Sequence, residues 1–236
     1  MKARTVLLAA TAFAGFIAAR RLFAPTRMPY QGLFRDELTG RRGEAEAARI
    51  IAGAQTRYAD FRSQQPHVAK LALRIHLERG LLPGLAVYQA LLAEGEDRRV
   101  ALQEMERLMA SIAGRMRPPF AALRVFPDPF AVFRRIEPLV VRFGFPSEGW
   151  EMTPVENTET CVAFNVSRCF YLDTLTSYGA PELTAVFCGG DDVLFEVLAP
   201  AVTWERTETL GRGHEQCNFR WRRAASGRTT GSAGSR

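Results

Sequence analysis

Residues that can carry acid–base, nucleophilic or ion-pairing chemistry gather between positions 165 and 219. This stretch holds three of the four cysteines, one of the three histidines and the adjacent pair Asp191-Asp192. The chain before it has mainly the pattern of supporting helices. We therefore look for a functional site in the C-terminal third, and its chemistry depends on which of these side chains meet.

Cys169 is the strongest candidate nucleophile. Ser167 is expected to cap a helix over residues 168–178, which places Cys169 in the first turn beside Arg168. Free amide N–H groups and the positive end of the helix dipole lower the pKa of a thiol at such a position. Cysteine is also among the most often buried residue types, so a packing role for Cys169 stays open.

The segment around Cys188 offers two carboxylates. A helix over residues 181–188 is expected to end at Gly189-Gly190, where the backbone can approach a ligand closely. Asp191 or Asp192 then caps the next helix, and the other can act as a base or orient a water molecule. Adjacent carboxylates point apart, so we do not expect a catalytic dyad. We assign Asp191 to catalysis, and Cys188 and Asp192 to substrate binding.

Two further residues can supply a cation and a proton. Arg206 lies on an expected strand over residues 202–210, where it can hold a substrate carboxylate through two hydrogen bonds or form a simple ion pair. His214 lies in a five-residue turn before a second strand over residues 215–222. There it can act as a general acid or base near neutral pH, or be an exposed turn residue.

Three pieces of this stretch, NVSRCFY, PELTAVFCGGDD and WERTETLGRGHEQCNFRW, occur in an order and spacing that resemble the L-2-amino-thiazoline-4-carboxylic acid hydrolase family. The resemblance implies an enzyme that opens a small cyclic amidine-like ring with water to give an N-carbamoyl amino acid. From their positions, we assign the attack to Cys169 or to a water held by Asp191. His214 would protonate the leaving sulfur, and Arg206 would bind the carboxylate.

The remaining pattern predicts an α+β fold with a helical half and a small antiparallel sheet with packed helices. An apparent Pro/Gly-rich hinge at residues 143–154 separates them. Alternation over residues 160–167 predicts a strand with a small, polar face that includes Asn165. This face suits a pocket wall with Tyr171 nearby, or the surface under a tightly packed helix. We read His67 and His76 as structural. Helices are expected over residues 44–61, 66–79, 82–94, 97–116 and 128–143.

The N-terminus has an uncharged apolar run over residues 5–19, followed at once by Arg20-Arg21. It predicts an uncleaved membrane-anchor helix over residues 5–23, and a cleaved signal peptide is the alternative. We divide the chain into this anchor (1–27), a helical region (28–150), a pocket-bearing α+β region (151–223) and a disordered tail (224–236). The net charge of +6 is concentrated at the two ends, and no nucleic-acid signature accompanies it. The cysteine spacing fits no common zinc site and predicts free thiols, a cytoplasmic body, and neither metal nor cofactor.

Two other functional classes stay open. A membrane-tethered module that binds or senses a small molecule without turnover would use the same pocket. A membrane-anchored scaffold whose helical half binds a protein would not depend on Cys169 or Asp191 beyond stability. The pattern leaves the oligomeric state open.

Overall fold

The computed structural model describes residues 27–64, 68 and 70–224. Within them the chain is an α+β protein with a helical N-terminal half and a four-stranded antiparallel sheet, which confirms the expected fold class. The anchor expected at residues 5–23, His67, and the tail beyond residue 224 lie outside the described residues. None of the described helices has the length and apolar character needed to cross a membrane.

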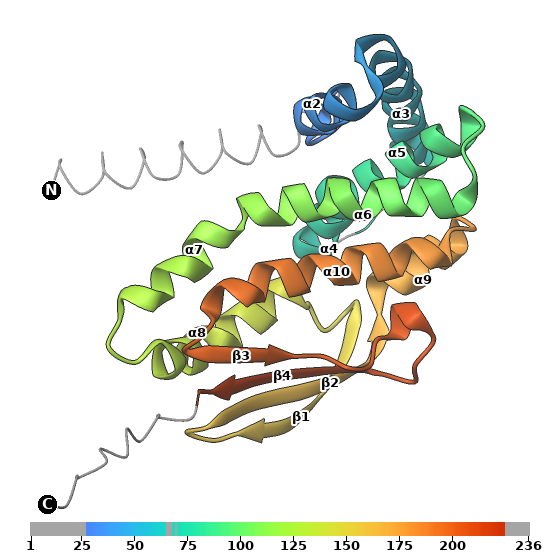
Figure 1. Ribbon diagram of the computed structural model, residues 1–236. Coiled ribbons are helices and arrows are strands. Elements are labelled where there is room, and N and C mark those ends of the chain that lie inside the picture. The colour runs from blue at the N-terminus through green and yellow to red at the C-terminus, as the bar shows by residue number, and fades with distance from the viewer. Residues whose placement is uncertain (1–26, 65–67, 69, 225–236) are drawn as a thin grey trace, which may run out of the picture.

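The helical half forms one apolar core from long helices packed on each other (Figure 1). Ile50 and Ile51 of α3 face Leu85 and Leu91 of α5, and all four are fully buried. Asp97 caps α6 as expected, accepting a hydrogen bond from the Arg99 amide at 2.9 Å. The elements are α2 (Gln31–Arg42), α3 (Glu44–Gln64), α4 (Leu71–Ile75), a π-helical turn (His76–Leu81), α5 (Leu82–Ala93) and α6 (Arg98–Arg115).

The expected helix end at Gly80 is wrong. The chain continues from α4 through the π-helical turn into α5 without a break. Leu77, Leu81 and Leu82 are buried along this stretch, and their burial outweighs the low helix propensity of one glycine, which costs about 1 kcal/mol. A π-helical turn shifts the following side chains around the helix and is often found at functional sites.

Two further helices and a 3₁₀ turn connect the helical half to the sheet. They are α7 (Arg117–Ala121), the 3₁₀ turn (Ala122–Val125) and α8 (Pro129–Gly144). Asp128 caps α8 as expected, accepting from the Ala131 amide at 2.9 Å.

The sheet has the strand order β1-β2-β4-β3, with every pair antiparallel. Phe164 of β2 lies opposite Phe219 of β4, and their rings stack with centroids 4.8 Å apart. Val162, Val166 and Trp221 share this buried face, which packs against the helices. The strands are β1 (Trp150–Asn157), β2 (Cys161–Cys169), β3 (Val202–Glu205) and β4 (Cys217–Arg223).

Two sheet predictions need correction. The segment read as a hinge contains most of β1, whose partner β2 supplies the hydrogen bonds that hold it extended despite Pro154. The strand expected over residues 202–210 ends at Glu205 and is followed by a loop and a 3₁₀ turn (Leu210–Arg212) instead of a tight hairpin. Arg206 therefore lies just beyond the end of β3.

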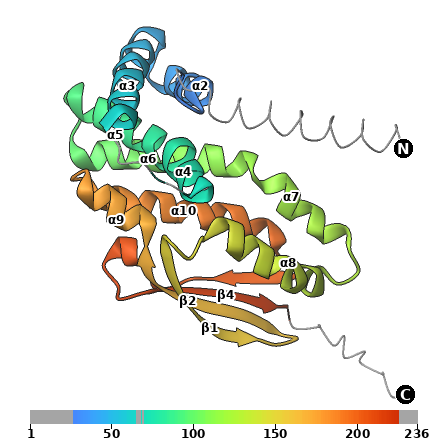
Figure 2. The ribbon, with the colours of Figure 1, turned by 180° about the vertical axis from the view of Figure 1, so that it is seen from behind.

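Two helices lie between the sheet and the helical half, α9 (Phe170–Ser177) and α10 (Thr184–Phe195). Both views place α10 between α6 and the sheet (Figures 1 and 2). The expected break of α10 at Gly189-Gly190 is wrong, because the helix runs through both glycines. Its packing on both sides overrides their low propensity. Residues 184 to 195 therefore present one continuous helical face to the sheet.

Candidate functional site

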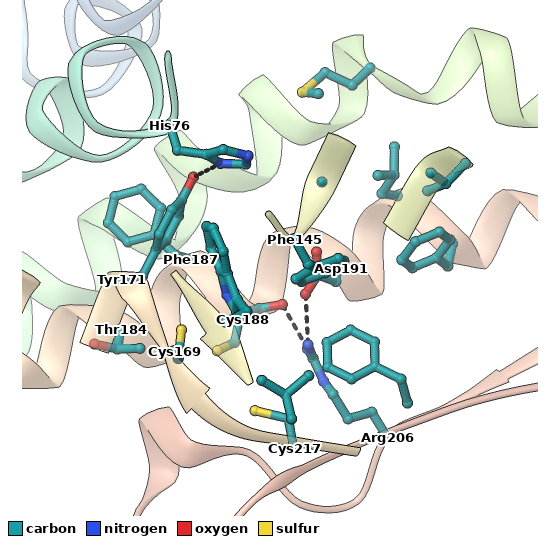
Figure 3. A pocket seen from close by; sticks show the side chains of 18 of the residues that line it. His76, Phe145, Cys169, Tyr171, Thr184, Phe187, Cys188, Asp191, Arg206 and Cys217 are labelled. Carbon is teal, nitrogen blue, oxygen red and sulfur yellow. Dashed lines mark hydrogen bonds and ion pairs between the residues drawn. The ribbon is translucent and has the colours of Figure 1, made fainter. Parts of the chain in front are cut away.

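A cavity of about 340 Å³ lies where the apolar core of the helical half meets that of the sheet. Its wall comes from the π-helical turn, α8, α9, α10 and the sheet, together with Arg206 (Figure 3). Most of the wall is aromatic or aliphatic, including Phe145, Trp150, Phe187 and Phe219. A concave, apolar cavity with a few polar groups is the usual form of a small-molecule site.

Helix α10 supplies the polar edge of this cavity. Thr184, Cys188 and Asp191 follow each other at spacings of four and three residues, so an unbroken helix aligns them on one face. All three line the cavity. The Thr184 hydroxyl is buried and has no hydrogen-bond partner among the described residues, which leaves it available to a ligand. Asp192 does not line the cavity, because the next helical position points elsewhere.

Arg206 ties α10 to the sheet. Its Nη1 donates to Asp191 Oδ2 at 2.7 Å, and its Nη2 donates to the Cys188 carbonyl at 2.7 Å (Figure 3). Nη2 also donates to Asp192 Oδ1 at 2.9 Å. The side chain is only 2% exposed and packs near the rings of Trp204 and Phe219. Burial acts to lower the pKa of Arg206, but the two carboxylates raise it overall, so the guanidinium stays charged.

Asp191 is the carboxylate that faces the cavity. Burial raises its pKa above the ordinary value of 3.8, and neighbouring Asp192 adds to this effect. The charge and hydrogen bond of Arg206 act in the opposite direction without cancelling it. A carboxylate whose pKa is raised above its ordinary value is better suited to general acid–base catalysis than an unperturbed one.

His76 and Tyr171 form a second polar pair in the cavity wall. His76 Nδ1 lies 3.1 Å from Tyr171 Oη, and Nε2 lies 3.4 Å from the Phe143 carbonyl oxygen. Burial lowers the pKa of His76, so the ring is neutral near pH 7. Because a carbonyl can only accept, Nε2 carries the proton and Nδ1 accepts from the Tyr171 hydroxyl.

Three cysteines line the same cavity, Cys169, Cys188 and Cys217, and all are free thiols. Burial raises the pKa of each, in the case of Cys188 to about 12. The lowered pKa expected for Cys169 is therefore wrong. Cys169 ends β2 and precedes α9, so Ser167 does not cap that helix. The amides of Leu172 and Tyr171 do favour a thiolate at Cys169, but burial outweighs them.

The model of the L-2-amino-thiazoline-4-carboxylic acid hydrolase family matches residues 74–221 of this chain. The chain belongs to this family. The match begins just before the π-helical turn and ends in β4, so it includes every cavity residue from His76 to Phe219. The family region and the cavity are therefore the same part of the molecule.

No curated protein matches the chain. Among solved structures, a similar one is the Fe(II) unliganded H-NOX protein from K. algicida, at 12% sequence identity. The similarity covers 85% of this chain and 97% of that chain, with a TM-score of 0.39. At that TM-score the likeness carries no weight for fold or function.

Within this hydrolase-family chain the structure brings together five of the eight residues singled out from the sequence. These five are Cys169, Tyr171, Cys188, Asp191 and Arg206. Asp192 lies behind Asp191 and accepts hydrogen bonds from Arg206 and from the Trp204 indole.

Two of the eight lie elsewhere. His214 bonds through Nδ1 with the backbone of Thr209 and does not line the cavity. Asn165 accepts a hydrogen bond from Arg220 on the opposite face of the sheet. The pocket wall is thus the apolar face of β2 with Val166, not the small, polar face that was expected.

His76 is the polar residue that sequence reasoning missed. It was read as structural because no carboxylate or cysteine stands at ligand spacing from it. Its position depends on the π-helical turn, which has no clear sequence signature, and on Tyr171, which is distant in the chain. Among the described residues, no group of three or more His, Cys, Asp or Glu side chains could hold a metal ion.

The close approach of Tyr171 to Gly80 gives a first prediction. A Cβ atom at Gly80 would lie 2.8 Å from Tyr171 Oη, so alanine there must displace the hydroxyl that bonds His76. We expect Gly80→Ala to lower the free energy of unfolding by about 1–3 kcal/mol, as overpacking does. Gly114→Ala in α6 is the control, since nothing lies within 4 Å of its Cβ, and it should stabilise by up to about 1 kcal/mol. Urea unfolding measures both, and equal effects would contradict the steric argument.

The raised pKa of Asp191 gives a second prediction. The folded chain binds this proton more tightly than the unfolded chain, whose pKa is near 3.8. The resulting stability is fully present below that value and is lost as pH rises through the raised folded pKa. We expect the stability of the wild type relative to Asp191→Asn to decrease from about pH 4 to pH 7. Urea unfolding across this range tests it, and a constant difference would show that the pKa is not raised.

Proposed function

We propose that the protein is a hydrolase that opens a cyclic amidine-like ring of the 2-amino-thiazoline-4-carboxylate type, giving an N-carbamoyl amino acid. The observation that carries this proposal is Asp191, a carboxylate held by a buried arginine on the wall of an apolar cavity. Family membership supplies the reaction type. A carboxylate is the natural partner of an amidine, because it accepts hydrogen bonds from two N–H groups at once.

Asp191 relays two protons in this reaction. In the first step, water adds across the C=N bond of the ring: its oxygen bonds to the carbon between nitrogen and sulfur, Asp191 takes a proton and passes it to the ring nitrogen. In the second step, the new hydroxyl gives its proton to Asp191 as the carbonyl forms and the carbon–sulfur bond breaks. Asp191 passes that proton to the leaving sulfur and returns to its ionised form.

Water is favoured over a cysteine as the nucleophile. A thiol attacks as its thiolate, and burial raises the pKa of Cys169, Cys188 and Cys217. His76 is not an activating base for them, because its Nδ1 accepts from Tyr171. The leaving sulfur, with an ordinary thiol pKa of about 8.5, departs readily and needs no strong acid. His214, outside the cavity, is not required for this step.

The test is to incubate the full-length chain with L-2-amino-thiazoline-4-carboxylate and to detect N-carbamoyl-cysteine by mass spectrometry. Mass detection avoids the background from the protein's own thiols. Product formation that survives in Cys169→Ser supports attack by water, and loss of turnover in that variant would support a covalent route. Absence of product together with a saturable rise in melting temperature would favour a binding module and overturn the hydrolase.

A further inference from the structure

A second cavity, of about 330 Å³, adjoins the first and is also lined by His76 and Tyr171. Its own wall is built from the helical half, with Phe34 of α2 and with Met109, Ile112 and Ala113 of α6. Gly190 of α10 also lines it beside Ala113, because a Cβ atom at Gly190 would lie 3.8 Å from Ala113 Cβ, an ordinary contact. We call this space the side chamber and the cavity with Arg206 the main chamber.

The two chambers share a wall. His76, Met116, Tyr171, Phe187, Asp191 and Leu194 line both. The reactive carboxylate therefore stands at the boundary between them, and a ligand that reaches Asp191 can extend into either chamber. Met116 is 54% exposed, so both chambers reach the surface at this residue.

The side chamber is lined mainly by apolar side chains. A five-membered ring with an amino and a carboxylate group has little apolar surface to place against Phe34, Met109 and Ile112. Burial of apolar ligand surface favours binding by about 25 cal/mol of free energy per Å² removed from water. A chamber of this size falls in the range of about 300–1,000 Å³ that holds drug-sized ligands.

The polar groups at the boundary do not favour a carboxylate on the ligand. Asp191 and Asp192 share one guanidinium, Arg206, so this group carries no excess positive charge. Arg79 also lines the side chamber and takes part in an interaction of its own. A carboxylate near Asp191 is therefore not attracted, whereas an amidine is.

Met116 is an exposed apolar residue at the boundary of the two chambers. It lines both of them and is 54% exposed. An apolar ligand group that enters beside Met116 therefore meets an apolar surface first.

We propose that the carboxylate of the substrate carries a large apolar group as an uncharged amide, so that ring opening gives the amide of an N-carbamoyl amino acid, and that the side chamber holds this apolar group while Asp191 holds the amidine ring. The proposal rests on the proposed ring opening and specifies its substrate class. The side chamber then determines specificity, and the apolar group enters beside Met116.

The experiment compares two substrates of the full-length chain: L-2-amino-thiazoline-4-carboxylate and its N-octyl amide, which is uncharged at that position and carries an eight-carbon chain. Both open by the same bond change, so product formation is measured by mass in each case. We expect kcat/KM to be at least tenfold higher for the octyl amide. A preference for the free acid would overturn the proposal and would indicate that Arg79 binds the carboxylate.

Ala113→Phe fills the side chamber without touching the main one, because Ala113 lines only the former. We expect this variant to raise KM for the octyl amide at least tenfold and to leave kinetics with the free acid within threefold. Ala110→Phe, on the same helix but lining neither chamber, is the matched control and should change neither substrate. If Ala113→Phe does not fold, Met109→Phe is the second variant, because Met109 also lines only the side chamber.

Failure of the hydrolase and failure of the side chamber give different results. Suppose that neither substrate is opened, but the octyl amide raises the melting temperature of the wild type and not of Ala113→Phe. The result would then support binding of the apolar group in the side chamber and contradict the proposed ring opening. If both proteins open both substrates equally well, the result supports the proposed ring opening and contradicts the role of the side chamber in specificity. If the octyl amide is neither opened nor bound, the chamber proposal is overturned.

Discussion

Replacing Asp191 with asparagine should lower kcat/KM for ring opening by about 100-fold or more, because a positioned general base contributes about 10²–10⁴ in rate. Asparagine keeps the size of the side chain and can still accept the hydrogen bond that Arg206 donates at 2.7 Å. It cannot take a proton from water. The effect should therefore appear in kcat, and KM should rise as well because a neutral amide holds the amidine less tightly than a carboxylate does.

Asp192→Asn is the matched control for this prediction. Asp192 accepts from the same guanidinium at 2.9 Å and from the Trp204 indole at 2.9 Å, but it lies outside the cavity. We expect its kcat/KM to fall less than tenfold. Steady-state kinetics on both variants decide the point. Equal losses would mean that the two carboxylates act only by holding Arg206, and the role of Asp191 as the base would be lost.

Replacing Arg206 with methionine should lower the free energy of unfolding by about 3 kcal/mol, near the lower end for breaking a buried ion pair. The guanidinium is 2% exposed and is held by Asp191, Asp192 and the Cys188 carbonyl. Without it, two neighbouring carboxylates repel each other. Their partial exposure, 31% and 49%, keeps the loss from being larger.

Arg222→Met supplies the control for stability. Arg222 of β4 pairs with Glu205 of β3 at 3.1 Å, but both side chains are nearly half exposed. Exposed pairs contribute about 0–1 kcal/mol, so this variant should stay within that range. Urea unfolding of both variants is the measurement, and similar losses would show that the Arg206 pairs contribute no more than surface pairs.

Replacing Arg206 with methionine should also shift the pH dependence of activity. Arg206 lowers the pKa of Asp191, so its removal raises that pKa further. The acid limb of the kcat/KM profile, below which Asp191 is protonated and inactive, should shift to higher pH in Arg206→Met. An unchanged limb would mean that a group other than Asp191 controls it.

The sequence by itself determined the features that depend on neighbouring residues. Asp97 and Asp128 cap helices α6 and α8, since a cap requires only the amides that follow it. The alternation of apolar and small polar side chains predicted strand β2, because the two-residue period of side-chain direction is a local property of an extended chain. The family resemblance and the choice of Cys188, Asp191 and Arg206 also came from local motifs, and the structure places these three around one cavity.

Tertiary structure decided what depends on distant contacts. Packing between α6 and the sheet carries α10 through Gly189-Gly190, and that continuity places Thr184, Cys188 and Asp191 on one wall. Burial reversed the expected pKa shift of Cys169, since desolvation outweighs the nearby amides. His76 lies in the site and Asn165 lies outside it because their partners, Tyr171 and Arg220, are far away in the chain.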